Sequence, residues 1–143
     1  KSGVSCHQIY LTEKSMSLTN AFETHTLNYL LTTGSVTRPT TWYIGLFTSD
    51  PTDTGAAGTE VSGSAYARTA VTFSVTADVA SNTAGVEFPA ATGGNWGTIG
   101  WIGIMDAATG GNMIIHSALT VAKAINDGDV FRIPTGDLDI TAS

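Results

Sequence analysis

Residues 98–119, TIGWIGIMDAATGGNMIIHSAL, contain two apolar runs joined by a short polar link, and they decide the fold. The first run is apolar on both of its alternating sides, which is typical of a central β-strand covered on both faces. One side is expected to carry Ile99, Trp101 and Met105, and the other Ile102 and Ile104. The link Asp106–Asn112 ends in Gly-Gly-Asn, which suits the left-handed positions of a hairpin turn. Met113–Leu119 is then predicted to be the return strand.

Further short runs outside this hairpin also have strand character. Trp42–Phe47 is apolar and aromatic, and Val71–Thr76 alternates apolar with hydroxyl residues. Three more runs follow at Val86–Phe88, Val130–Ile133 and Leu138–Thr141. Gly, Pro, Asn and Asp mark turns between them, at spacings of roughly ten residues. This pattern predicts a mainly β fold, an antiparallel β-sandwich of jelly-roll type.

One segment has helical periodicity instead. Apolar residues recur there at intervals near three and four, at Leu18, Phe22, Leu27, Tyr29, Leu30 and Leu31. They predict an N-terminal helix over 18–33 with one buried face. Asn20 and Glu23 can cap its start reciprocally, and Ser17 is an alternative cap. Gly34 is expected to end the helix with a positive φ.

The length of 143 residues fits one domain. We expect residues 16–143 to form a single β-sandwich domain that includes the helix. Met16 is followed by Ser-Leu-Thr-Asn, which looks like the start of a gene. Residues 1–15 are therefore interpreted as a translated leader, a cloning remnant or a flexible native arm.

Composition excludes several classes of partner. The chain has 6 Lys and Arg against 12 Asp and Glu, a formal net charge of −6, whereas proteins that bind duplex nucleic acid present a basic face. No apolar run approaches the roughly 18 residues that span a bilayer. The side chains best suited to zinc, Cys6, His7, His25 and His116, are too few and too scattered for a structural site. We expect no nucleic acid, no membrane, no metal and no cofactor.

Catalytic patterns are also missing from the sequence. There is no Gly-x-Ser-x-Gly elbow, and His116 lies on a predicted strand, where a half-buried imidazole bonded to a neighbour is expected. Acidic residues occur in pairs at Asp50 and Asp53, Asp127 and Asp129, and Asp137 and Asp139. Each pair straddles a turn, where Asp side chains bond the local backbone. A weak calcium site is the alternative at the first two pairs. The sequence therefore predicts a protein that is not an enzyme.

A few residues are candidates for binding. Trp96 lies in a Gly-rich turn and is the best candidate for an exposed ring that stacks on a sugar or a partner; Tyr66 is second. For Trp96 itself, packing over the end of the sandwich is the favoured expectation, and stacking on a ligand or at a partner interface is the alternative. The loop from Asp50 to Ser64 is expected at the surface, and Arg68 is expected to pair with Glu60 or a turn aspartate. The candidate binding or interface residues are Trp96, Tyr66, Arg68, Asp50, Asp53 and Glu60.

Several blocks of sequence occur together in the order of a known family. They are Pro39–Asp53, Gly58–Gly63, Tyr66–Arg68, Asn82–Pro89, Trp96–Thr98, Gly103–Asn112, Gly128–Pro134 and Gly136–Leu138. The chain resembles, over roughly Met16 to Thr141, a family of small tailed-bacteriophage virion proteins commonly called phage tail fibre proteins. The resemblance implies a structural protein of the phage particle, with no catalytic residues to carry over.

The resemblance leaves two placements in the virion open. The chain has neither the collagen-like nor the heptad repeats of long trimeric fibres, and it is equally similar in kind to capsid decoration or cement proteins. Our hypothesis is a non-enzymatic structural protein that docks on the capsid or tail surface and self-associates. Its partners would be the major capsid or tail protein and further copies of itself. It would be located in the virion and assembled in the cytoplasm of the bacterial host. The alternative is a carbohydrate-binding adhesin module of a phage tail, which would bind a host surface glycan.

Overall fold

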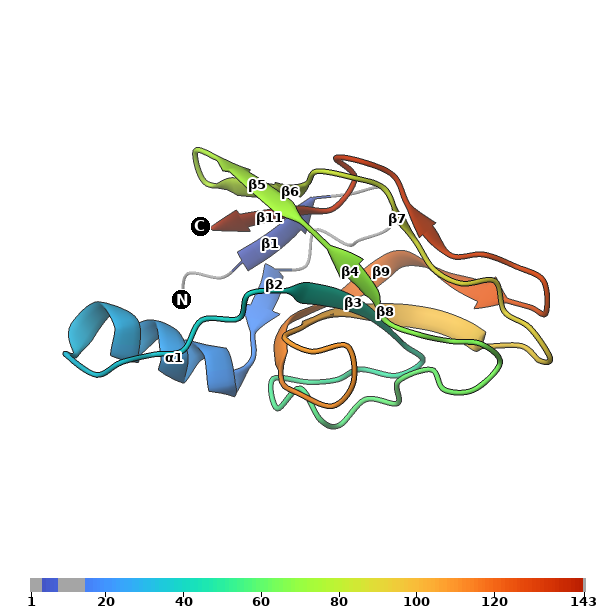
Figure 1. Ribbon diagram of the computed structural model, residues 1–143, viewed down its shortest axis with the longest axis horizontal. Coiled ribbons are helices and arrows are strands. Elements are labelled where there is room, and N and C mark those ends of the chain that lie inside the picture. Colours follow the sequence, from blue (N-terminus) through green and yellow to red (C-terminus); the bar gives the residue numbers. More distant parts are fainter. Residues whose placement is uncertain (1–3, 8–14, 143) are drawn as a thin grey trace.

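The computed structural model describes residues 4–7 and 15–142, which form eleven strands and one helix (Figure 1). The helix, α1, spans Asn20–Leu31. The strands are β1 (Val4–His7), β2 (Ser15–Leu18), β3 (Trp42–Phe47), β4 (Thr69–Val71), β5 (Phe73–Thr76), β6 (Val79–Asn82), β7 (Val86–Glu87), β8 (Gly97–Met105), β9 (Met113–Ile125), β10 (Arg132–Ile133) and β11 (Asp139–Ala142). All strand pairs are antiparallel, so the predicted mainly β fold with one N-terminal helix is confirmed.

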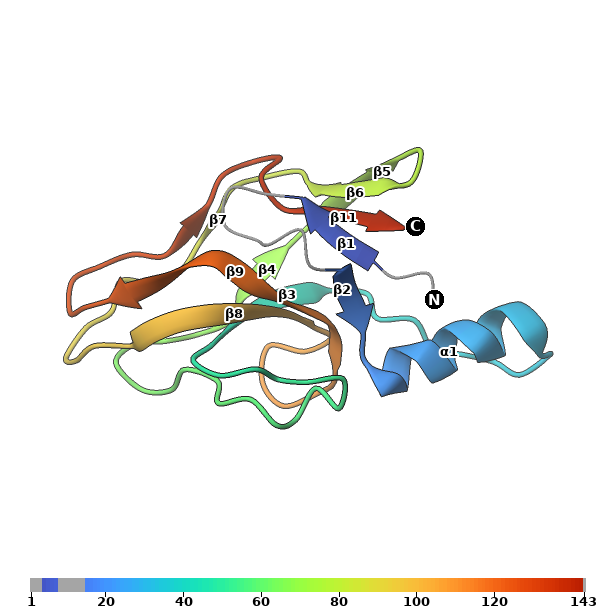
Figure 2. The same cartoon turned by 180° about the vertical axis from the view of Figure 1, so that it is seen from behind.

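Of the described strands, nine form one sheet in the order β4-β3-β8-β9-β2-β1-β11-β6-β5, and β10 pairs with β7 separately. The large sheet bends over, so that β1, β11, β6 and β5 lie above β3, β8 and β9 (Figures 1 and 2). The edge strands β4 and β5 follow each other in the chain with only Thr72 between them. The chain therefore passes from one layer to the other at Thr72, which gives a sandwich-like arrangement.

This change of layer divides the strand that the sequence predicts over Val71–Thr76. Val71 is buried in β4, and Phe73 in β5 packs against the core. Val75, next in the alternation, is 72% exposed, because β5 is an edge strand that extends past the core. The alternation with a period of two is therefore present, but only its first two apolar residues, Val71 and Phe73, pack on apolar neighbours.

Strand β8 lies between β3 and β9, and its second half, Ile102–Met105, is buried on both faces, as predicted. Its inner face supplies Ile102 and Ile104 to the main core. Its other face supplies Met105, which forms a smaller cluster with Phe47 and Met113. The expectation that Ile99 shares a side with Trp101 is wrong, because Ile99 belongs to the main core whereas Trp101 packs on the smaller cluster. A bulge between these two residues, in the pairing with β9, shifts the alternation.

Two glycines allow the smaller cluster to pack closely on the sheet. Gly45 and Gly103 pair directly across β3 and β8. A Cβ atom at Gly103 would lie 2.6 Å from Cε of Met113 and 3.2 Å from the Phe47 ring. The space that these two side chains occupy therefore depends on glycine at this position. In the predicted β8–β9 turn, Gly110 and Gly111 have the positive φ values, 59° and 70°, that the hairpin requires.

The ends of α1 differ in detail from the predicted ones. The helix begins after Thr19, which has an extended backbone and makes no side-chain cap bond, so neither Asn20 nor Ser17 is the N-cap. The N–H of Thr32 bonds to the carbonyl of Asn28 at the other end, and Gly34 does not have a positive φ. The chain leaves the helix in extended conformation instead of turning through glycine.

The predicted buried face of α1 is mostly absent. Phe22 is its one buried residue, whereas Leu27, Tyr29, Leu30 and Leu31 are 57%, 75%, 65% and 76% exposed. The helix points away from the sandwich at one end of the molecule (Figure 1). Its periodicity is real, but only its first turn reaches the body of the protein. No helix in the described part of the chain has the length and apolar character to cross a membrane.

Part of the N-terminal segment, predicted as a leader, remnant or arm, belongs to the sheet. The strand β1 pairs with β11 on one side and β2 on the other, and β2 in turn pairs with β9. These strands join the two layers through continuous backbone pairing. The rest of that segment, residues 1–3 and 8–14, lies outside the described residues.

The double burial of β8 predicts a large cost for Ile102→Ala. Ile102 is 1% exposed, so we expect the substitution to lower the free energy of unfolding by about 2–5 kcal/mol through lost transfer energy and a residual cavity. Val121, which is 64% exposed on β9, supplies the control. Val121→Ala should change the free energy of unfolding by no more than about 0.5 kcal/mol. Urea unfolding measures both. Equal losses would contradict the core described here.

Candidate functional site

The loop from Asp50 to Ser64 follows β3 and carries three of the candidate residues. Its backbone returns along β3, where the N–H of Val61 bonds to the carbonyl of Leu46 at 2.9 Å. Its first part reaches α1, since the N–H of Asn20 bonds to the carbonyl of Asp53 at 2.9 Å. The loop is at the surface as predicted, and it is fixed at both ends by backbone hydrogen bonds.

The Glu60 carboxylate holds the far end of this loop. It accepts hydrogen bonds from Nε and Nη2 of Arg68, each at 2.7 Å, in a two-pronged ion pair. It also accepts one from the Tyr66 hydroxyl at 2.8 Å. The predicted pairing of Arg68 with Glu60 is therefore confirmed, and Tyr66 joins it.

Arg68 and Tyr66 extend this network to two further segments. The Nη1 atom of Arg68 donates to the carbonyl oxygens of Ala107 and Gly110, at 2.8 and 2.7 Å, in the β8–β9 turn. The Tyr66 hydroxyl accepts from the N–H of Leu46 in β3 at 2.9 Å. One guanidinium and one phenol thus connect the loop, β3 and the hairpin turn.

Burial makes this network strong. The side chains of Arg68 and Glu60 are 8% and 25% exposed, so water screens their attraction little. Burial raises the pKa of the Tyr66 hydroxyl well above its ordinary value of 10, an effect that the Leu46 N–H opposes and the Glu60 charge adds to. The hydrogen bond to Glu60 likewise raises the pKa of Arg68. Both groups keep their protons at neutral pH, which suits a structural brace.

Trp96 is not the exposed ring that its Gly-rich turn indicates. It is 5% exposed, and its Nε1 donates to the carbonyl of Ser64 at 2.9 Å. Its ring meets Tyr66 edge-on at 5.3 Å between centroids and Phe88 at 6.3 Å. The favoured expectation, packing at the end of the sandwich, is therefore confirmed, and the alternative of an exposed stacking ring is wrong. The aromatic cluster closes the core beneath the turn.

Asp50 and Asp53 lie beside His116. Oδ1 of Asp50 is 3.8 Å from Nδ1 of the imidazole, and Oδ1 of Asp53 is 3.6 Å from Nε2. The carboxylates are 48% and 58% exposed, whereas His116 is buried. Neither ring nitrogen has a hydrogen-bond partner in the described part of the chain, so the expected bond to a neighbour is wrong. The loop brings these groups together from positions far apart in the sequence.

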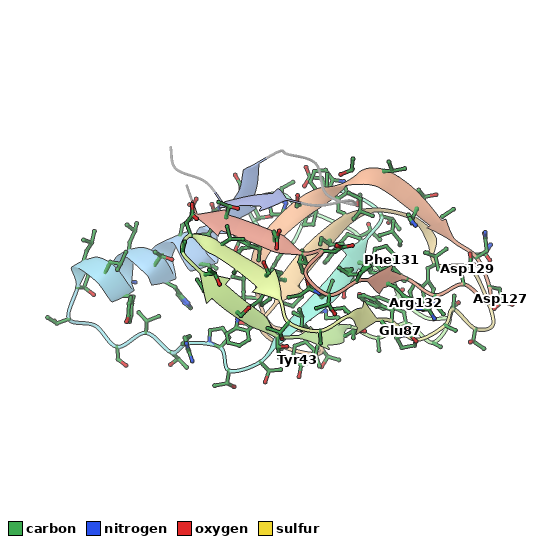
Figure 3. The ribbon with its side chains drawn as sticks, turned by 90° about the horizontal axis from the view of Figure 1, so that it is seen from above. Tyr43, Glu87, Asp127, Asp129, Phe131 and Arg132 are labelled. Atoms are coloured by element: carbon green, nitrogen blue, oxygen red, sulfur yellow. The ribbon has the colours of Figure 1, made fainter. Side chains whose placement is uncertain are left out.

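Asp127 and Asp129 serve turns. Asp127 accepts a hydrogen bond from the N–H of Gly93, and Asp129 accepts one from the N–H of Asn126, each at 2.9 Å. Figure 3 shows both near the end of the molecule opposite α1, on the same side as the surface ion pair of Glu87 and Arg132. Across residues 4–7 and 15–142, no three His, Cys, Asp or Glu side chains are grouped in a way that could hold a metal ion.

The candidate residues thus form two groups, one at each end of the loop. Glu60, Arg68 and Tyr66 share hydrogen bonds, with Trp96 packed against Tyr66, and Asp50 and Asp53 form the second group around His116. Sequence reasoning missed the carbonyls of Ala107 and Gly110, since any residue supplies a carbonyl and only the fold places it. The arrangement offers a rigid loop that presents two exposed carboxylates, which suits binding of a basic surface.

Comparison with known proteins adds one finding. The family model described as "Podophage GP4 fiber I protein gp80" matches residues 17–141. The match extends over α1, the loop and all six candidate residues. A sequence search finds no match among proteins with curated functions.

Two Arg–Glu pairs of similar geometry allow a matched test of the brace. Arg68 pairs with Glu60 at 2.7 Å in a largely buried position, and Arg132 pairs with Glu87 at 2.6 Å with both side chains 63% exposed. We expect Arg68→Gln to lower the free energy of unfolding by roughly 2–4 kcal/mol, because Glu60 and two carbonyls lose partners. Arg132→Gln should cost no more than about 1 kcal/mol. Urea denaturation of both variants checks this, and equal costs would contradict a brace at Arg68.

The raised pKa of Tyr66 predicts a loss of stability in alkali. Above pH 10 the unfolded chain releases this proton while the folded protein keeps it, so the free energy of unfolding falls as pH rises. The loss of unfolding free energy that is due to Tyr66 approaches about 1.4 kcal/mol per pH unit. Tyr66→Phe should remove this loss, so that the free energy of unfolding, measured with urea, falls less steeply between pH 9 and 11. An unchanged slope would show that Tyr66 is not held neutral.

Proposed function

The chain belongs to the podophage GP4 fiber I protein family, and from this premise we propose that it is a non-enzymatic structural component of a tailed-phage virion. In this role it docks on the capsid or tail surface, as a decoration or cement protein or as a tail accessory protein, and self-associates. It is assembled in the cytoplasm of the bacterial host. The family match over residues 17–141 carries the proposal, because it spans both layers of the sandwich.

The braced loop supports docking in physical terms. Glu60, Arg68 and Tyr66 hold the loop against β3 and the β8–β9 turn before any partner arrives. A surface that is already ordered loses little conformational entropy on binding. Because a virion presents many identical sites, a self-associating protein needs only modest affinity at each one.

The proposed contact residues are the exposed carboxylates of Asp50 and Asp53. They are 48% and 58% exposed on this fixed loop, and they would meet basic groups of the major capsid or tail protein. The loop is held in place by hydrogen bonds of Glu60, Arg68, Tyr66 and Trp96. The glycan-binding alternative depends on stacking by Trp96 and Tyr66, and it loses support because Trp96 is buried and the Tyr66 hydroxyl is engaged inside the network.

Mass spectrometry of purified virions of the phage that encodes this chain tests the proposal. We expect the protein in particles at a fixed ratio to the major capsid protein, after gradient purification that removes host proteins. Its absence from particles would overturn the proposal. Deleting the gene then separates the two placements: a cement role predicts particles that break on heating, and a tail role predicts intact particles that adsorb poorly.

The docking residues are tested by complementing the deletion phage with variants. Asp50→Asn with Asp53→Asn should reduce incorporation into particles at least several-fold, because the negative charge of the loop is lost. Asp78→Asn, at an exposed aspartate between β5 and β6, is the control and should be incorporated like the wild type. Full incorporation of the double variant would show that the docking surface does not depend on Asp50 and Asp53.

A further inference from the structure

The exposed helix α1 borders an apolar groove. The groove has a volume of about 310 Å³ and lies between α1 and the segment that follows it. Its helical side is formed by Phe22, His25, Thr26, Tyr29 and Leu30. These positions follow the spacing of three and four that places side chains on one face. The facing side is formed by Val36, Thr37, Arg38 and Pro39.

The helix lacks the support that a helix of this length needs. It has 12 residues and no side-chain cap at its start, and only Phe22 is buried. Isolated helices of about 12 to 15 residues are marginal in water, and packing of an apolar face supplies most of their stability in proteins. The Nδ1 atom of His25, on the groove, is also buried without a hydrogen-bond partner among the described residues. Both observations indicate that this face is completed by a partner.

The charge of this region favours another copy of the same chain. Residues 20–39 contain one acidic residue, Glu23, and one basic residue, Arg38, so their formal net charge is zero, whereas the whole chain carries −6. Two copies that meet through α1 therefore bring together the part of each chain that has no net charge. Contact through the remaining surface would bring the acidic parts together.

The exposed area is also sufficient for a modest interface. Leu27, Tyr29, Leu30 and Leu31 each expose on the order of 100 Å² of apolar surface, given their exposed fractions of 57–76%. With the groove walls, two copies would bury on the order of 1,000 Å² in total, the lower limit for a specific interface. Such an area matches a weak contact that is reinforced when many copies assemble.

We propose that α1 and its groove form the self-association surface, with α1 of a second copy covering this groove. The side chains of Leu27 and Leu31, on the next face of the helix, fill the neighbour's groove, and the two contacts are equivalent. The inference rests on the proposed self-association and assigns it to a surface separate from the docking loop. It also accounts for apolar residues that the fold of one copy leaves in water.

Analytical ultracentrifugation and hydrogen exchange of the purified full chain test this inference. Between about 5 and 500 µM, we expect the wild type to shift from monomer to a larger species. Amides of α1 should become at least tenfold more protected over the same range. Leu27→Gln with Leu30→Gln should stay monomeric with unprotected α1 amides, while β8 and β9 remain as protected as in the wild type. Gln keeps good helix propensity, so the helix itself is not penalised.

The control replaces two apolar residues that are equally exposed elsewhere. Val75 and Val121 are 72% and 64% exposed, and Val75→Gln with Val121→Gln should associate like the wild type. A wild type that stays monomeric at 500 µM with unprotected α1 amides would overturn both this inference and the proposed self-association. Association that persists in the helix variant would overturn this inference alone. Neither result alters whether the protein is present in virions.

Discussion

Burial of β8 on both of its faces is the constraint on which the rest of the structure depends. A strand that is apolar on both sides needs a layer above it and a layer below it. Ile99, Ile102 and Ile104 of β8 belong to the main core, and on the other side Met105 packs with Phe47 and Met113 of the neighbouring strands β3 and β9. The surface loop is fixed beside this second face, and Arg68 connects it to the turn that follows β8.

The sequence predicts this centre well because its signals are local. The Gly-Gly-Asn turn and the double-sided run up to Met105 each depend on neighbouring residues, and both are present as expected. The side taken by Ile99 could not be predicted, because the bulge that shifts it arises from pairing with β9. The packing partners of Trp96 could not be predicted for a similar reason, since its Gly-rich turn says nothing of the aromatic cluster that encloses it.

The candidate site shows the same limit. The pairing of Arg68 with Glu60 is predictable, since the two are eight residues apart and few cations are available. The approach of Asp50 and Asp53 to His116 is not, because it requires a loop to fold over a distant strand. The helix is the reverse case: its period is clear, yet periodicity cannot say whether the apolar face meets its own core or another molecule. A rigid sandwich with one unsupported helix fits our proposal that the protein completes its packing on assembly.

Cryo-electron microscopy of intact virions tests the central claim most directly, because it shows the protein in place among its neighbours. The account predicts density that fits the sandwich, with the loop from Asp50 to Ser64 against a capsid or tail protein and α1 against α1 of an adjacent copy. Particles whose density fits the sandwich but leaves both the loop and α1 in solvent would contradict it.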